Sequence, residues 1–258
     1  MNRFCLLGLA LSICANAIPS AFAGTPNTTA AGAVSYEVNQ GWVTHAIDEA
    51  AQDRWFVFRE VGGRSYCIEA GVGVATYVPL DPNLTLYSDG AGTTQLAANS
   101  DGTSEPGMNK GARICYASTQ SLTTSSPAPS TLRSFRVNVP IAGGSGDSGF
   151  VRVRVVETTL VSGQVGSGSN NWEYRLYNLG TTNVTASFYV PTTGKSSDVT
   201  LLPERRGSGN ISALFSGGFS NSRPVYIMHN GAPGTVVGTL AKTDANGSTL
   251  SEMDVFPR

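Results

Sequence analysis

Residues 53–70 read DRWFVFREVGGRSYCIEA, and this stretch decides the fold. Its first part is rich in aromatic and β-branched residues, Gly62-Gly63 interrupts it, and residues 65–70 resume the apolar pattern. A two-glycine connection between β-rich runs is typical of a hairpin. The stretch therefore predicts a strand, a tight turn and a second strand paired with the first.

The same short-strand pattern continues along most of the 258 residues. Further apolar runs, separated by Gly, Asn, Asp and Pro, occur at residues 84–87, 95–98, 112–117, 134–139, 150–156, 172–179, 184–190, 198–202, 210–215, 224–229 and 235–240. This spacing, with 30 glycines and almost no helical periodicity, predicts an all-β protein. Residues 43–51 are expected to form at most a short helical turn or a loop. Charged residues are only 14% of the chain, with 17 basic against 18 acidic, so a nucleic-acid partner is excluded.

A change in composition divides the chain into two predicted β-sandwich domains. Residues 161–171, VSGQVGSGSNN, are rich in Gly and Ser and are expected to form a linker. The first sandwich is placed at residues 34–160 and the second at residues 172–258. Residues 24–33 are small and polar and are expected to form a flexible leader.

The first 23 residues have the features of a signal peptide. Arg3 is followed by an apolar stretch over residues 4–15, and Ala21-Phe22-Ala23 supplies the small residues that precede cleavage. The apolar stretch is shorter than the roughly 20 residues that a membrane-spanning helix needs. We expect a secreted protein, periplasmic or extracellular, with no transmembrane segment in its mature chain.

Two of the four cysteines, Cys5 and Cys14, lie in this signal segment. Export leaves Cys67 and Cys115 in a compartment that permits disulfides. Alternation along YCIE and RICY places each cysteine on the face opposite its Ile and Tyr neighbours. We therefore predict a disulfide between them, with two separate buried thiols as the alternative.

The first half resembles the bacterial pre-peptidase C-terminal (PPC) domain, a jelly-roll-like sandwich. The resemblance rests on the order of DRWFVF at 53–58, GGRSYCIE at 62–69, LTLYSD at 84–89, LAANSDG at 96–102, RICY at 113–116 and FVRV at 150–153. It departs from the family in its cysteine pair and in a longer loop at residues 119–130. The second half resembles generic immunoglobulin-like modules of exported bacterial proteins. The resemblance implies a non-catalytic accessory domain, associated in some relatives with calcium or with binding to surfaces.

A calcium site is a further hypothesis, centred on Asp89 and Asp101. With Asp81, Asn83 and Asn99 they supply oxygen ligands in two turns, and calcium prefers several such oxygens. Asp and Asn are also ordinary turn residues, because their side chains bond to the nearby backbone. The spacing does not match an EF-hand.

A catalytic alternative comes from Gly146-Asp147-Ser148-Gly149, the sequence around the nucleophile of chymotrypsin-like proteases. His45 and Asp81 precede it in the order that a triad requires. The motif lacks the glycine and proline expected after it, and His45 to Ser148 leaves little room for two barrels. We expect no serine hydrolase activity.

Aromatic side chains offer a third class, carbohydrate binding, since flat rings can contact sugars. The candidates are Trp42, Tyr77, Tyr87, Trp172, Tyr174 and Tyr177. Trp55 and Trp172 are expected in the cores instead. The leading hypothesis is an exported, non-catalytic binding or structural module without a cofactor, whose partner is a protein or a polysaccharide at the cell envelope or outside the cell.

Overall fold

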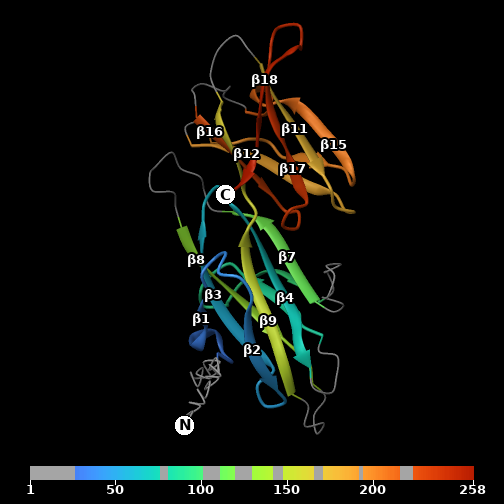
Figure 1. Ribbon diagram of the computed structural model, residues 1–258. Coiled ribbons are helices and arrows are strands. Elements are labelled where there is room, and N and C mark those ends of the chain that lie inside the picture. Colours follow the sequence, from blue (N-terminus) through green and yellow to red (C-terminus); the bar gives the residue numbers. More distant parts are fainter. Residues whose placement is uncertain are drawn as a thin grey trace, which may run out of the picture.

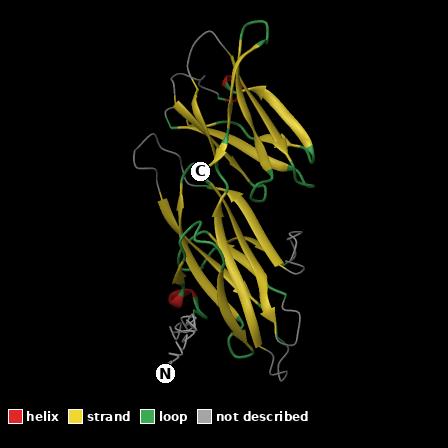
Figure 2. Cartoon of the chain, in the orientation of Figure 1, coloured by secondary structure: helices red, strands yellow, loops and turns green. Residues whose placement is uncertain are grey.

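The protein consists of two β-sandwiches that lie end to end, joined where β9 leads into β10 (Figures 1 and 2). The computed structural model describes residues 27–75, 81–100, 111–119, 130–141, 148–165, 171–191, 194–215 and 223–258. Within these ranges the only helical segments are two 3-10 turns, η1 (Ala30–Gly32) and η2 (Ser212–Leu214). The predicted all-β class is confirmed, and the predicted signal peptide lies outside the described residues.

The first sandwich has two sheets. Sheet 1 has the order β1 (Val34–Ser35), β3 (Asp53–Val61), β8 (Ser130–Asn138), β5 (Asn83–Tyr87), β6 (Gln95–Asn99). Sheet 2 has the order β2 (Val43–Asp48), β9 (Ser148–Glu157), β4 (Ser65–Ala75), β7 (Gly111–Ala117). Their inner faces enclose a core that includes Phe56, Phe58 and Phe135, all almost fully buried. Strand alternation explains this core, because Phe56 and Phe58 are two residues apart on β3.

The second sandwich also has two sheets. Sheet 3 has the order β13 (Gly194–Lys195), β12 (Val184–Val190), β16 (Arg223–His229), β10 (Leu160–Val165), β19 (Phe256–Pro257), and β14 (Val199–Leu201) also pairs with β12. Sheet 4 has the order β15 (Arg205–Asn210), β11 (Asn171–Asn178), β17 (Val236–Thr243), β18 (Thr249–Asp254). Trp172, Leu176 and Phe188 lie in its separate core. The two sandwiches therefore enclose separate cores.

The predicted disulfide is present between Cys67 and Cys115. The two residues lie directly opposite each other on β4 and β7, with Cα atoms 4.0 Å apart. Tyr66 and Ile68, the neighbours of Cys67, point into the core. The shared-face argument from alternation is confirmed.

The predicted hairpin at residues 53–70 is wrong, although both strands exist. β3 pairs with β8 and β1, whereas β4 pairs with β7 and β9, so the two strands belong to opposite sheets. Gly62-Gly63 crosses from one sheet to the other, with Gly63 at a φ of 75°. Both strands carry apolar residues that need a facing layer, and packing across the sandwich satisfies that need.

The linker predicted at residues 161–171 is not the boundary between the sandwiches. Leu160–Val165 forms β10, which pairs with β16, and both Leu160 and Val165 lie in the second core. The buried Ser162 hydroxyl also accepts a hydrogen bond from the Val225 amide at 3.1 Å. Pairing thus orders the first part of the Gly/Ser tract, and residues 166–170 lie outside the described ranges.

The structure also differs from three expectations for the N-terminal part of the chain: the flexible leader, the place of Trp55 and the helical turn at residues 43–51. Residues 27–33 of the predicted flexible leader pack on sheet 1, where the Asn27 carbonyl and side chain bond to the backbone of Trp55. Trp55 is buried on the outer face of that sheet, stacked on Tyr87, instead of in the core. Residues 43–48 form β2, not a helical turn.

Candidate functional site

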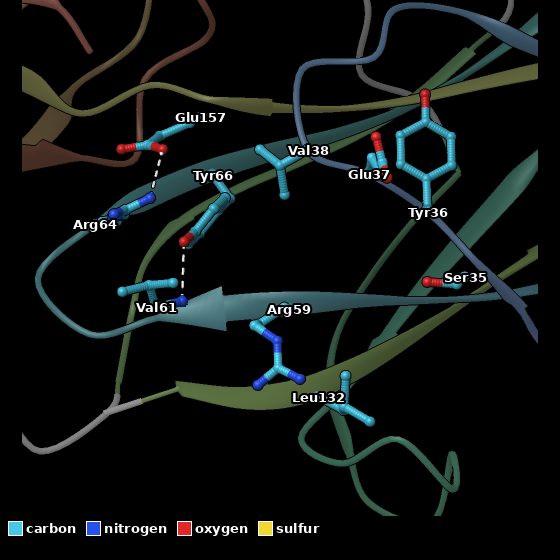
Figure 3. A pocket seen from close by; sticks show the side chains of 10 residues that line it. All are labelled: Ser35, Tyr36, Glu37, Val38, Arg59, Val61, Arg64, Tyr66, Leu132 and Glu157. Carbon is cyan, nitrogen blue, oxygen red and sulfur yellow. Dashed lines mark hydrogen bonds and ion pairs between the residues drawn. The ribbon is translucent and has the colours of Figure 1, made fainter. Parts of the chain in front are cut away.

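A pocket of about 340 Å³ opens on the flank of the first sandwich, beside the ends of β3 and β9 (Figure 3). It is called the β3 pocket here. It is lined by Ser35, Tyr36, Glu37, Val38, Arg59, Val61, Arg64, Tyr66, Leu132 and Glu157. These residues come from both sheets and from the chain that crosses between them. The pocket therefore lies where the sandwich is not closed by a paired strand.

The short length of β1 creates this opening. β1 runs parallel to β3 only opposite Phe56 and Val57, and the chain then leaves β3 after Tyr36 donates its amide to the Val57 carbonyl at 2.7 Å. Three residues later the Asn39 amide bonds to Val155 on the opposite sheet. Figure 3 shows this segment diverging from β3 above the pocket.

The edge of β3 next to this segment is open at Arg59. Residues 55, 57, 59 and 61 turn their backbone groups toward the same side, because the pairing of β3 with β8 has no register shift. On that side Trp55 bonds to Asn27, the Val57 carbonyl accepts from Tyr36, and the Val61 amide donates to the Tyr66 hydroxyl at 2.9 Å. No described residue bonds to the Arg59 amide or carbonyl on this side. One donor and one acceptor of a strand edge therefore face the β3 pocket.

An ion pair forms the inner wall. The Arg64 Nη1 lies 3.1 Å from the Glu157 Oε2, and the Glu157 side chain is only 6% exposed. Asn39, which has a φ of 68°, also contacts Glu157: its side-chain oxygen accepts a hydrogen bond from the Glu157 backbone amide at 2.9 Å. Arg64 Nε and Glu157 Oε1 are both buried and have no hydrogen-bond partner among the described residues. The wall thus contains one ion pair, and neither of these two unpartnered atoms has surface open to the pocket.

Two tyrosines form the floor of the pocket. Burial raises the pKa of Tyr66 to about 12, although the hydrogen bond that its oxygen accepts from the Val61 amide lowers the pKa. Burial also raises the pKa of Tyr36, whose hydroxyl contacts the Gly41 and Val153 carbonyls. Both hydroxyls therefore stay protonated near neutral pH and serve as fixed hydrogen-bonding groups.

The outer rim is exposed. Arg59 and Leu132 lie directly opposite each other on β3 and β8, and Leu132 is 46% exposed. Arg59 donates to the Ser130 hydroxyl at 3.0 Å, which keeps its guanidinium beside the rim. Glu37 is exposed on the crossing segment. A ligand along β3 would meet polar groups inside and a mixed apolar and charged surface outside.

The structure does not bring His45, Asp81 and Ser148 together. β2 and β9 pair with Asp48 opposite Ser148, so His45 lies on the other face of sheet 2 from Ser148. The His45 ring packs against Phe56 in the core, with ring centroids 4.7 Å apart. Asp81 is exposed two residues before β5, on sheet 1.

Asp89 has the geometry of a turn former. Its two carboxylate oxygens accept from the Ala91, Thr93 and Thr94 amides and from the Thr93 hydroxyl, at 2.8 to 3.2 Å. The Thr93 bonds are the main cause that lowers the pKa of Asp89 to about 2. Asp101, the other residue of the calcium hypothesis, lies outside the described residues. In the parts that the structure describes, no group of three or more His, Cys, Asp or Glu is placed to hold a metal ion.

The aromatic candidates do not share one surface. Trp42 is half-buried, and the guanidinium groups of Arg152 and Arg154 lie 4.8 and 4.5 Å from its ring centroid. The others are scattered: Tyr87 on Trp55, Trp172 and Tyr174 in the second core, Tyr177 exposed on β11, and Tyr77 outside the described residues.

Sequence reasoning missed the β3 pocket altogether. Arg59 and Arg64 lie inside the stretch that predicted the fold, but their residue types indicate only strand positions there. The one available signal was the arginine on each side of Gly62-Gly63. Glu157 and Glu37 are far away in sequence, so only the fold brings them to the same place.

No protein-family model matches the chain, and no curated protein matches it either. The resemblance to the PPC domain remains an expectation from the residue patterns. No helix among the described residues is long and apolar enough to cross a membrane.

Proposed function

We propose that this protein is an exported, non-catalytic binding module that takes up an extended peptide segment of a partner protein along the open edge of β3. The observation that carries the proposal is the unpaired backbone of Arg59, which faces the β3 pocket. Strand addition to a sheet edge supplies main-chain hydrogen bonds, and adjacent pockets then select side chains. The signal-peptide features and the Cys67–Cys115 disulfide support action outside the cytoplasm.

The surroundings suit such a segment. A strand that continues the line of β1 would face the Arg59 amide and carbonyl with its own backbone. Its side chains would alternate between the outer rim at Leu132 and the inner wall at Tyr66 and Glu157. Each new backbone bond contributes only about 0.5–1.5 kcal/mol, so the pocket contacts must supply the rest of the affinity.

The test is a titration of the isotope-labelled mature protein with blocked seven-residue peptides, followed by backbone amide NMR. In each peptide threonine and valine alternate, and the peptides differ only in the central residue. That residue is glutamine, threonine, methionine, leucine, glutamate or lysine. We expect at least one to shift the Arg59 and Val61 amides saturably and to protect Arg59 from hydrogen exchange. N-methylation of successive peptide nitrogens should then weaken binding most at the single position whose amide donates to the Arg59 carbonyl, because this edge has only one free acceptor.

Two variants provide the matched comparison. Arg59→Pro removes the free amide, and proline is tolerated on an edge strand where the N–H faces outward. Arg59→Ala removes the same side chain but keeps the amide. Arg59→Pro should weaken binding by about tenfold, the value of one backbone bond, while Arg59→Ala retains the affinity. Absence of saturable shifts for every peptide, or equal weakening at every N-methylated position, would refute strand addition.

A further inference from the structure

Sheet 4 of the second sandwich ends in β15 on one side and β18 on the other, and each of these strands pairs with only one neighbour among the described residues. No residue of either strand is buried, and five of the six residues of β18 are exposed. Figure 1 shows β15 along the margin of this sandwich. Both edges of sheet 4 are therefore accessible to the strand of another chain.

The free edge of β15 carries positive charge. The Ile211 amide bonds to the Trp172 carbonyl on β11, so the two-residue period of the strand turns the backbone groups of Arg206 and Ser208 away from β11. No described residue bonds to these backbone groups. Arg205 and Arg206 are both exposed, and neither guanidinium makes a hydrogen bond or an ion pair within the described chain. Because β15 contains no acidic residue, its edge presents two positive charges.

The free edge of β18 carries negative charge. The Val255 amide bonds to the Gly238 carbonyl on β17, so the same period turns the backbone groups of Glu252 and Asp254 away from β17. These groups too have no partner among the described residues. The Glu252 carboxylate contacts Arg175 at 3.5 Å, whereas the exposed Asp254 carboxylate makes no ion pair with a described residue. Because β18 contains no basic residue, its edge presents two negative charges.

The strand directions allow these two edges to meet. β15, β11, β17 and β18 are joined by three successive antiparallel pairings, so β15 and β18 run in opposite directions. A second copy in the same orientation can therefore continue the sheet, with its β15 antiparallel to β18 of the first copy. Pairing β15 with β15, or β18 with β18, would bring like charges together. The charges thus favour contact between the unlike edges.

We propose that this protein associates with copies of itself by pairing β18 of one copy with β15 of the next. Arg206 then lies opposite Asp254 and Ser208 opposite Glu252, and the two residues of each pair exchange both of their backbone hydrogen bonds. The Arg206 guanidinium and the Asp254 carboxylate lie on the same face of the continued sheet and form an ion pair across the contact. Two joined copies keep one free edge of each kind, so association continues into an open chain or a ring.

Sedimentation velocity of the mature protein, from about 1 μM to about 1 mM, tests this contact. The weight-average mass should rise with concentration beyond that of a dimer, because β15 and β18 lie on opposite sides of the sheet. Raising the salt concentration from about 0.1 M to about 1 M shortens the Debye length from about 10 Å to about 3 Å and should lower this mass. A monomer at every concentration, or a mass that stops at the dimer, would overturn the proposal.

A charge exchange tests the register of the contact. Arg206→Asp and Asp254→Arg each place like charges opposite each other, so each should weaken association at least about tenfold. The double variant restores opposite charges and should associate within about threefold of the unmodified protein. Arg223→Asp is the matched control, because Arg223 is exposed on β16 and its substitution changes the net charge as Arg206→Asp does. The control should leave association unchanged.

Two further outcomes distinguish this contact from others. If the double variant associates as weakly as the single variants, Arg206 and Asp254 do not face each other and the proposal fails. Arg59→Pro blocks the edge of β3 and should leave self-association unchanged, since β15 and β18 belong to the second sandwich. Loss of self-association in Arg59→Pro would assign the contact to β3 and rule out the pairing of β15 with β18.

Discussion

His229 makes the stability of the second sandwich dependent on pH. It is the last residue of β16, opposite Ala186, and only 2% of its surface is exposed. Its ring lies against the backbone of Thr158 and Gly231, where β9 leads into the second sandwich. Burial is the main cause that lowers the pKa of His229 from 6.5 to about 4, so the folded protein holds this ring neutral near pH 7.

The difference between the pKa of His229 in the unfolded and the folded chain gives the sign and size of the change in the free energy of unfolding. The unfolded chain binds a proton near the ordinary pKa of 6.5, whereas the folded chain resists it until about pH 4. The contribution of His229 is therefore present above pH 6.5 and is lost as the pH falls toward 4. Between about pH 7 and about pH 5 the loss is about 2 kcal/mol, and in full it is about 3 kcal/mol.

Urea unfolding measures this loss, with tryptophan fluorescence and circular dichroism as separate probes of the transition. The experiment compares the protein with His229→Gln across this pH range. The variant removes the titrating group, so its free energy of unfolding should fall by about 2 kcal/mol less between about pH 7 and about pH 5. His45, whose pKa burial also lowers to about 4, remains in both proteins and cancels in the comparison. Equal pH dependence in the two proteins would refute the argument.

Two further predictions concern the first sandwich. The Glu60 carboxylate is fully buried and accepts hydrogen bonds from Tyr116, Ser118 and Arg133. Glu60→Gln should therefore lower the free energy of unfolding by about 3–5 kcal/mol. The control Glu37→Gln, at an exposed position, should change it by less than about 0.5 kcal/mol. Urea titrations measure both variants, and a loss below about 1 kcal/mol for Glu60→Gln would contradict the importance of this network. Reducing the Cys67–Cys115 disulfide should cost about 4 kcal/mol, because the bond closes a loop with a sequence separation of 48. Thermal melts with and without reductant measure it, and an unchanged melting temperature would contradict a contribution of this size.

Local patterns predicted those features that depend on alternation alone. Cys67 and Cys115 could be placed on one face because each lies next to residues that must point into the core. The strands around Trp55 and Trp172 were predicted for the same reason. Alternation is a property of the strand itself and needs no knowledge of its neighbours.

Features that depend on which strands pair were not predictable in this way. Gly62-Gly63 has the composition of a hairpin turn, yet it connects opposite sheets, and only the partners of β3 and β4 distinguish the two cases. Val165 belongs to the second core although it lies in a Gly/Ser-rich tract. The β3 pocket depends on how far β1 accompanies β3, which the two exposed residues of β1 do not indicate.

The edge of β3 differs from an unprotected strand edge, and this difference favours a binding role. Exposed edges promote indiscriminate pairing, and proteins usually cover them or place charges beside them. Here Asn27 covers the edge at Trp55, Tyr36 covers it at Val57, and the Tyr66 hydroxyl accepts the Val61 amide. The opening is thus confined to Arg59, whose charged side chain stands at the rim. Under the proposed strand addition, a bound segment would have to fit this short edge beside the charged rim, so pairing at β3 would be selective and general aggregation through the same edge disfavoured.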